Sequence, residues 1–240
     1  KELQPYNQFD FTGRSNSVGG LHYAWLIRNF HFFGETSMSA NKAIGTVNGV
    51  MIGLDPKLGM VLLQRYYQKD FQNLYSNAIA EASRPVNENG LYYGLEFKPS
   101  GKWNLNAYAD MFKSEWLRFG VDAPSKGNEY LAQLTFKPDK QTEIYVRYRQ
   151  RNKEYNTDLG GIPIDYTVNV NQRNYRFNLT HKVNKNISLH TRYEQVVINR
   201  EDGPTNVGFL AFQDIAYKPA LSDFSFNLRY ALFNTQDYDS

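Results

Sequence analysis

Several stretches of this chain alternate apolar and polar residues with a period of two. In Thr142–Arg151, the residues Ile144, Val146 and Tyr148 alternate with mostly charged neighbours. In Phe224–Phe233, aromatic and aliphatic residues alternate with Ser, Asn, Arg and Ala. Successive side chains of a β-strand point to opposite faces, so this pattern predicts strands that have one apolar and one polar face.

About twelve segments of this kind follow one another, and their lengths approach the roughly 10 residues of a tilted membrane-spanning strand. The predicted strands are Gly20–Ile27, Phe30–Ser39, Ile44–Leu54, Met60–Gln68, Leu91–Phe97, Trp103–Phe112, Glu129–Lys137, Thr142–Arg151, Asn174–Val183, Ile187–Val197, Gly208–Tyr217 and Phe224–Phe233.

The connections between these segments fall into two classes. Short connections rich in Pro, Gly, Asn and Asp supply the backbone angles of tight turns. They alternate with mostly longer polar connections at Lys69–Gly90, Lys113–Asn128, Asn152–Gln172 and Arg200–Val207. Short turns at one end and long loops at the other are typical of an antiparallel, up-and-down transmembrane β-barrel. A repeat of about 40 residues suggests a β-propeller instead. A soluble propeller or sandwich with a carbohydrate-binding face is therefore the alternative.

Composition agrees with an all-β membrane protein. The chain of 240 residues has no cysteine, a formal charge of +3 and 15% aromatic residues, and no window approaches 18 apolar residues. A helical span is therefore not expected, whereas a barrel needs only every second residue to be apolar. We expect residues 1–240 to be an outer-membrane barrel domain of a Gram-negative cell. The polar end NTQDYDS suggests that the domain is incomplete at one or both ends, as part of a larger barrel.

Charged residues gather on the face opposite the apolar one. Arginine costs about 2–4 kcal/mol at the bilayer midplane, so these side chains are expected to face the lumen. They form either a ladder of interstrand arginine–carboxylate pairs or a cationic constriction that attracts anions. The predicted lumen-facing residues are Glu96, Asp110, Glu143, Arg147, Arg149, Arg176, Arg192, Glu194 and Arg229.

No catalytic, metal or cofactor motif stands out. The four histidines lie on separate predicted strands without the spacing of metal ligands. Ser188 and His190 share a face, but two residues along a strand are too far apart for a nucleophile and its base. We predict no enzyme, no metal and no cofactor.

Two long loops carry further features. The sequence AIAEA, ended by Pro85, favours a short helix in the loop Asn77–Gly90. The loop Lys113–Asn128 carries Trp116, Leu117 and Phe119. These residues either fold back as a plug over the barrel mouth or contact a partner protein.

Four strings in the chain resemble a known family. They are HYAWLIRNFHFFGE (22–35), RYYQKDFQNLYSNAIAEASRPVNENGLYYGLEFKP (65–99), WLRFGVDAPSKGNEYL (116–131) and RYALFNTQDYDS (229–240). They are similar to the C-terminal β-barrel region of Bacteroidota outer-membrane proteins labelled helix-hairpin-helix domain proteins. The resemblance implies an outer-membrane location and supplies no catalytic residues. Because the chain lacks the helix-hairpin-helix segment, no nucleic-acid partner is expected.

Two functions remain open on the sequence. The first is a structural or accessory subunit of an outer-membrane secretion or assembly complex, which the aromatic loops and a crowded lumen favour. The second is a passive or plugged pore for small solutes, with arginines that bias it towards anions. The expected partners are outer-membrane lipid and other outer-membrane or periplasmic proteins.

Overall fold

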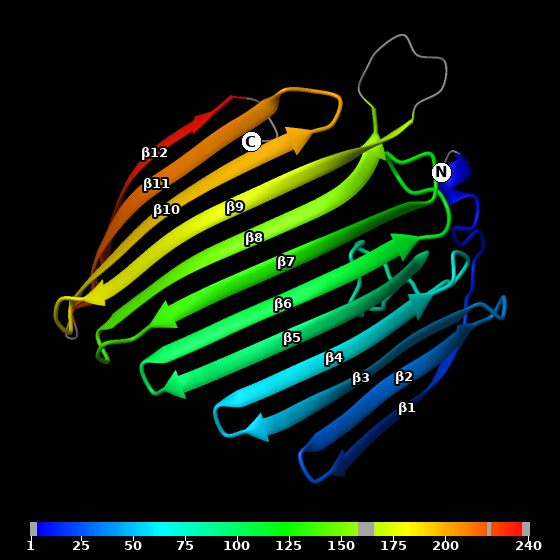
Figure 1. The fold of residues 1–240 in the computed structure, drawn as a ribbon, viewed down its shortest axis with the longest axis horizontal. Coiled ribbons are helices and arrows are strands. Elements are labelled where there is room, and N and C mark those ends of the chain that lie inside the picture. The colour runs from blue at the N-terminus through cyan, green and yellow to red at the C-terminus, as the bar shows by residue number, and fades with distance from the viewer. Residues whose placement is uncertain (1–3, 158–165, 220–221, 237–240) are drawn as a thin grey trace. The chain divides into compact units, whose positions relative to one another are not determined.

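The computed structural model describes residues 4–157, 166–219 and 222–236. These residues form the short 3-10 helix η1 (Pro5–Asn7) and twelve strands (Figure 1). The strands are β1 (Val18–Ile27), β2 (Phe30–Ser39), β3 (Ile44–Asp55), β4 (Leu58–Tyr67), β5 (Glu88–Ser100), β6 (Trp103–Ser114), β7 (Ser125–Phe136), β8 (Thr142–Asn156), β9 (Thr167–Lys182), β10 (Ile187–Arg200), β11 (Thr205–Tyr217) and β12 (Phe226–Thr235).

All twelve strands belong to one sheet and are hydrogen-bonded in chain order, with β1 and β12 at the two ends of the order. Figure 1 follows this order by colour, from blue β1 to red β12. The pairs with a described register, such as β1–β2 and β10–β11, are antiparallel. The prediction of an all-β, antiparallel, up-and-down fold with about twelve strands is therefore confirmed.

Some predicted boundaries are wrong. β5 begins at Glu88 and β9 at Thr167, both earlier than expected, and β8 continues to Asn156. The connection predicted as a long loop after β10 is a short turn of residues 201–204. The added ends of β5 and β8 are mostly polar. In β9 the added residues Val168 and Val170 are out of phase with Phe177 and Leu179, so a single alternation does not cover the whole strand. Part of the predicted loop after β8 and the last residues of the chain lie outside the described residues.

The chain divides into two compact units. The first contains residues 1–95, 108–129 and 152–170, and the second contains residues 96–107, 130–151 and 171–240. In the first unit, Phe30, Phe32 and Met38 of β2 are exposed on one side, whereas Ser37 and Ser39 on the other side are buried. The alternation read from the sequence therefore separates an open apolar side from a covered polar side within β2.

The covered side of the first unit contains a small apolar core. Tyr67 and Phe71 are buried together with Ala43. Gly45 pairs with Tyr67 across β3 and β4, and a Cβ atom at Gly45 would lie 2.5 Å from the Phe71 ring. Because only glycine leaves room for this ring, the chain after β4 can fold back onto the sheet.

The second unit shows the same two-sided character. Ile215 of β11 pairs with Leu228 of β12, and both side chains are exposed. At the adjacent position, Asp214 pairs with Arg229 on the opposite side of the strands and the two side chains form an ion pair. Apolar residues thus occupy one side of this strand pair, and its charged residues meet on the other.

Candidate functional site

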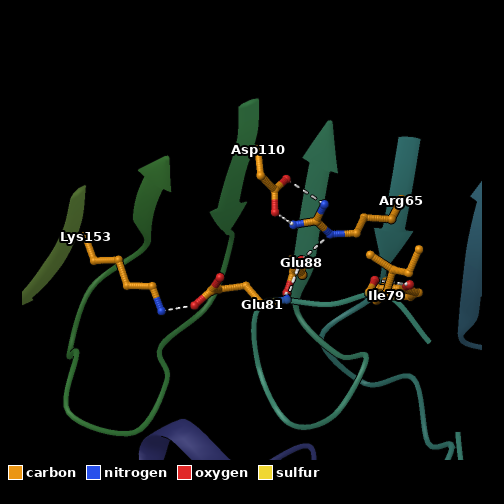
Figure 2. A network of polar contacts seen from close by, with 7 residues as sticks. Arg65, Ile79, Glu81, Glu88, Asp110 and Lys153 are labelled. Atoms are coloured by element: carbon orange, nitrogen blue, oxygen red, sulfur yellow. Dashed lines mark hydrogen bonds and ion pairs between the residues drawn. The ribbon is translucent and has the colours of Figure 1, made fainter. Parts of the chain in front are cut away.

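A buried arginine lies at the centre of the most enclosed polar cluster of the first unit. The Arg65 side chain on β4 has no solvent exposure. Its Nε donates to Glu88 Oε1 at 2.5 Å, and its terminal nitrogens donate to both Asp110 oxygens at 2.8 and 3.1 Å. Figure 2 shows the guanidinium held between these two carboxylates, which come from β5 and β6. One cation therefore ties three consecutive strands together on their covered side.

The backbone of β5 makes room for this guanidinium. A Cβ atom at Gly90 would lie 2.5 Å from Arg65 Cζ. Gly90 is two residues after Glu88, so both face the same side of the strand. The sequence Glu-Asn-Gly at the start of β5 thus provides a carboxylate for the arginine and then an open surface beneath it.

The cluster extends into the loop of residues 68–87. Glu88 also accepts hydrogen bonds from the backbone N–H of Glu81 at 3.1 and 2.9 Å. Glu81 in turn forms an ion pair with Lys153 of β8, and both side chains are largely buried (Figure 2). Tyr67 donates to the carbonyl of Ile79 at 2.7 Å. These contacts hold the loop against the covered side of the sheet.

The helix predicted in this loop is wrong, because residues 77–87 contain no helical turn in the structure. The backbone N–H of Glu81 and the carbonyl of Ile79 form hydrogen bonds with the side chains of Glu88 and Tyr67. In a helix both groups would instead bond to the backbone of residues one turn away. Tertiary contacts thus override the local helix propensity of AIAEA.

The N-terminal segment packs against the loops of the same unit. Trp116 Nε1 donates to the Pro5 carbonyl at 3.1 Å, and the Trp116 and Phe9 rings meet edge to face at 5.4 Å. Arg84 binds both carboxylate oxygens of Asp10 at 3.0 and 3.2 Å. We refer to residues 4–16, 68–87 and 115–124 together as the cap.

The three predicted loop residues have different surroundings. Trp116 is half-buried in the cap, and the carbonyls of Trp116 and Leu117 accept hydrogen bonds from Asn87. Phe119 is 81% exposed, although its ring lies edge to face with the Tyr6 ring, with 5.6 Å between the ring centroids. Of the two hypotheses for this loop, the contacts of Trp116 and Leu117 correspond to a plug, and the exposure of Phe119 leaves one ring open to a partner.

The other charged residues expected to face the lumen occupy the second unit, apart from Asp110. Arg176 binds Glu194 through two hydrogen bonds of 2.8 and 2.7 Å, and Arg229 binds Asp214 through two of 2.6 and 2.8 Å. Pairing of arginine with carboxylates thus occurs in part of the predicted ladder, and Asp214 is a partner that the sequence reasoning missed.

The remaining members of the set have other contacts. Arg147 donates to Gln133 at 2.7 Å, and Arg149 shares its side of β8 by strand alternation. Arg192 donates to Asn178 at 3.2 Å and lies 5.5 Å over the Phe212 ring. The rest pair with nearby lysines: Glu96 with Lys98 and Glu143 with Lys137.

Sequence reasoning also missed Arg65, Glu88, Glu81 and Lys153. Arg65 could have been found from its parity with Leu63 and Tyr67, which places it on the covered side of β4. Glu88 and Glu81 were assigned to a loop, and nothing in their spacing indicates their partners.

Within the described ranges, no group of three or more His, Cys, Asp or Glu residues has the arrangement of a metal site. His190 contacts Asn178 at 2.8 Å and Asp214 at 3.4 Å. No helix among the described residues is long and apolar enough to cross a membrane.

Asp139, in the tight turn between β7 and β8, is a charged group whose role is local. Hydrogen bonds from the backbone N–H groups of Gln141 at 2.7 Å and Thr142 at 2.8 Å lower the pKa of its carboxyl group. The Thr142 hydroxyl donates to the same carboxylate at 3.2 Å. The anionic carboxylate therefore holds the turn closed.

No family model and no curated protein sequence matches the chain. Among solved structures, it is similar to OmpT of Vibrio cholerae, an outer-membrane protein. A mutant of OmpT lacking loop L8 aligns at 10% identity with a TM-score of 0.48, covering 93% of this chain and 95% of the mutant. OmpT itself aligns at 10% identity with a TM-score of 0.46, covering 94% of this chain and 89% of OmpT. The NanC porin aligns at 12% identity with a TM-score of 0.33, covering 91% of this chain and 97% of the porin.

Proposed function

We propose that this chain forms the wall of an outer-membrane β-barrel that is closed at its long-loop end by its own cap. In this role it acts as a structural or accessory subunit of a membrane complex. The observation that carries the proposal is the packing of the cap over the buried Arg65 cluster.

A membrane location is supported by the side of the strands that carries exposed apolar residues. In β12, Phe226, Leu228 and Leu232 are 65, 66 and 51% exposed. A soluble protein rarely exposes a contiguous row of this kind, whereas a lipid-facing strand requires it. The charged residues of the same strand pair lie on the opposite side, where water or other polar groups can solvate them.

An outer-membrane barrel is supported by the connections. Short turns such as residues 28–29, 56–57 and 101–102 join the strands at one end, and the loops of residues 68–87 and 115–124 join them at the other. In outer-membrane barrels the short turns face the periplasm and the long loops face the exterior. On this basis we place the cap on the outer side of the membrane.

Closure of the barrel by the cap is supported by the buried ion pairs that join the cap to the strands. Lys153 and Glu81 join the loop of residues 68–87 to β8, and Glu88 joins it to Arg65. A loop that is held by largely buried ion pairs cannot leave without exposing unpaired charges, which is strongly unfavourable. The cap therefore belongs to the folded wall and restricts passage along the covered side of the first unit.

An accessory role is supported by aromatic side chains that the cap does not bury. Phe119 is 81% exposed and Tyr75 is 96% exposed. Aromatic residues are enriched at protein interfaces, and Tyr is enriched among the residues that contribute most of the binding energy. We propose that they contact another outer-membrane or periplasmic protein.

A second function, a small pore with a preference for anions, is favoured by one observation. Arg147 and Arg149 lie on one side of β8, and Arg147 binds the neutral Gln133 in place of a carboxylate. A wall cation that binds a neutral amide, as Arg147 does, would attract anions into a water-filled channel.

Planar-bilayer recording of the purified protein tests the proposal. We expect a silent barrel in the wild type and conductance steps when both Arg84 and Trp116 are replaced by alanine, because these residues anchor the N-terminal segment. A Phe119→Ala variant is the matched control, since this ring is mostly exposed. Stable anion-selective steps in the wild type would contradict a closed barrel and support the pore.

A further inference from the structure

The cap encloses a cavity of about 240 Å³ in the first unit. Its wall includes the aromatic rings of Tyr6, Phe9, Trp116 and Phe119, and its polar side includes residues of the loop 81–88 and the first residues of β7. Binding pockets for drug-sized molecules measure about 300–1,000 Å³, so this cavity has room for a smaller molecule. Rings on one side and charged groups on another are the lining that ligand sites share.

The charges that line the cavity do not balance. Five cationic residues, Lys69, Arg84, Arg118, Lys126 and Lys153, face three acidic ones, Asp10, Glu81 and Glu88. Each acidic residue already has a cationic partner, because Asp10 pairs with Arg84, Glu81 with Lys153 and Glu88 with Arg65. The excess charge of the lining is therefore positive.

Lys69 is the cation that is best placed to bind an anion. Its Nζ lies 4.6 Å from the ring centroids of both Phe9 and Trp116. Within the part of the chain that the structure describes, Lys69 forms no ion pair. Two ring faces can hold an ammonium group in place, but they leave its N–H donors without a carboxylate or carbonyl acceptor.

Lys126 gives the cavity a second cation of this type. Its backbone N–H donates to Glu154 at 2.8 Å, while its side chain forms no ion pair within the described residues. Lys126 stands at the start of β7, next to Ser125, whose hydroxyl accepts a hydrogen bond from Arg118 at 3.0 Å. Positive charge thus comes to the cavity from both the loop after β4 and the start of β7.

We propose that this cavity binds a small anionic solute of about the size of one sugar. The anionic group of the solute accepts hydrogen bonds from Lys69 and Lys126, and its body packs against the rings of Phe9, Trp116 and Phe119. A carboxylated or phosphorylated sugar has this chemistry, since it joins an anion to a flat C–H face that aromatic rings can cover. Binding also holds the N-terminal segment to the loops, because the ring walls belong to both.

The proposal is tested by calorimetric titration of the purified full chain in a non-ionic detergent with D-glucuronate, and with glucose as the uncharged probe. We expect glucuronate to bind, and glucose to bind at least tenfold more weakly. Lys69→Met keeps the length of the aliphatic chain between the rings and removes the charge, so we expect it to weaken glucuronate binding by about tenfold or more. Lys57→Met, at the tight turn between β3 and β4, is the matched control and should leave binding unchanged.

A variant at the wall of the cavity protects the test against a folding defect. If Lys69→Met lowers the melting temperature, Lys126→Gln provides the same comparison, because Lys126 is exposed and lies outside the pair of rings that holds Lys69. It should weaken glucuronate binding severalfold. Three results would each overturn the proposal. The wild type does not bind glucuronate, both lysine variants bind glucuronate as tightly as the wild type does, or the wild type binds glucose as tightly as glucuronate.

Discussion

Replacing Arg65 by methionine should destabilise the protein far more than the loss of an ordinary surface charge. The Arg65 side chain is fully buried, and the Glu88 side chain that it binds is only 3% exposed. Removing one partner of a buried ion pair costs about 3–5 kcal/mol, because the other charge stays buried without compensation.

The structure places the expected loss in the lower half of that range. Glu88 keeps two hydrogen bonds from the backbone N–H of Glu81, which continue to solvate its carboxylate. Asp110 is 16% exposed and can be reached by water. Gly90 leaves space in which a methionine side chain can lie without a clash. We therefore expect Arg65→Met to lower the free energy of unfolding by about 3 kcal/mol.

The assay is equilibrium unfolding in detergent, followed by circular dichroism and by the mobility of unheated samples on a gel. Lys98→Met is the matched control, because Lys98 forms a 2.8 Å pair with Glu96 in which both side chains are about half exposed. Exposed pairs contribute about 0–1 kcal/mol. An Arg65→Met loss no larger than that of the control would refute the conclusion that the cluster fastens the first unit.

Three further outcomes are expected. Trp116→Ala should lower the unfolding free energy by about 1–3 kcal/mol through the lost ring and cation contacts without releasing a bound protein, and loss of a co-purifying protein at unchanged stability would contradict a cap role. Leu228→Arg should reduce the yield of folded, membrane-assembled protein much more than Asn227→Arg, because only the first places charge in hydrocarbon at about 2–4 kcal/mol; equal yields would show that the proposed faces are wrong. Asp139→Asn should lower stability at pH 7, and the difference should vanish in acid, because the folded-state pKa of Asp139 is lowered; its contribution is present above the ordinary pKa of about 4 and is lost as the pH falls through the lowered value. Melting curves between pH 7 and pH 2 measure this difference, and a constant gap would contradict it.

The strands of the sheet could be predicted because one side of each is apolar over most of its length. Thr142–Arg151 and Phe224–Phe233 lie almost wholly in β8 and β12. The beginning of β5 could not be predicted because its residues Glu88 and Asn89 are polar. The beginning of β9 was missed because its apolar residues Val168 and Val170 lie on the opposite side of the strand from Phe177, so the alternation changes phase within the strand. Period two predicts a strand only where the two sides meet different environments.

The contacts of the candidate site were much less accessible to sequence reasoning. Parity predicts on which side of its strand a residue such as Arg176 lies, but not whether it faces Glu194 or another acid. That choice depends on the register between strands. The apolar pattern excludes a shift of one residue, but the turns decide among registers that differ by two. Arg65 and Glu88 are 23 positions apart in the sequence with the loop of residues 68–87 between them, so only the folded loop shows that they meet.

The same limit explains why the cap was visible in the sequence only as two alternatives. A tryptophan in a polar loop, such as Trp116, is expected to pack against something. The composition of the loop does not show whether it packs against the same chain or against another protein. In the structure the decisive contacts come from Phe9 and Pro5, more than 100 residues earlier in the sequence. An aromatic ring such as that of Phe9 and a carbonyl such as that of Pro5 occur in many loops, so their presence in the sequence does not identify them as partners of Trp116. They meet Trp116 because the strands bring these segments together. The Arg65 cluster sets that position by joining β4, β5 and β6 beneath the loop of residues 68–87. The loss of stability caused by Arg65→Met should therefore be accompanied by weaker packing of the N-terminal segment against the loops.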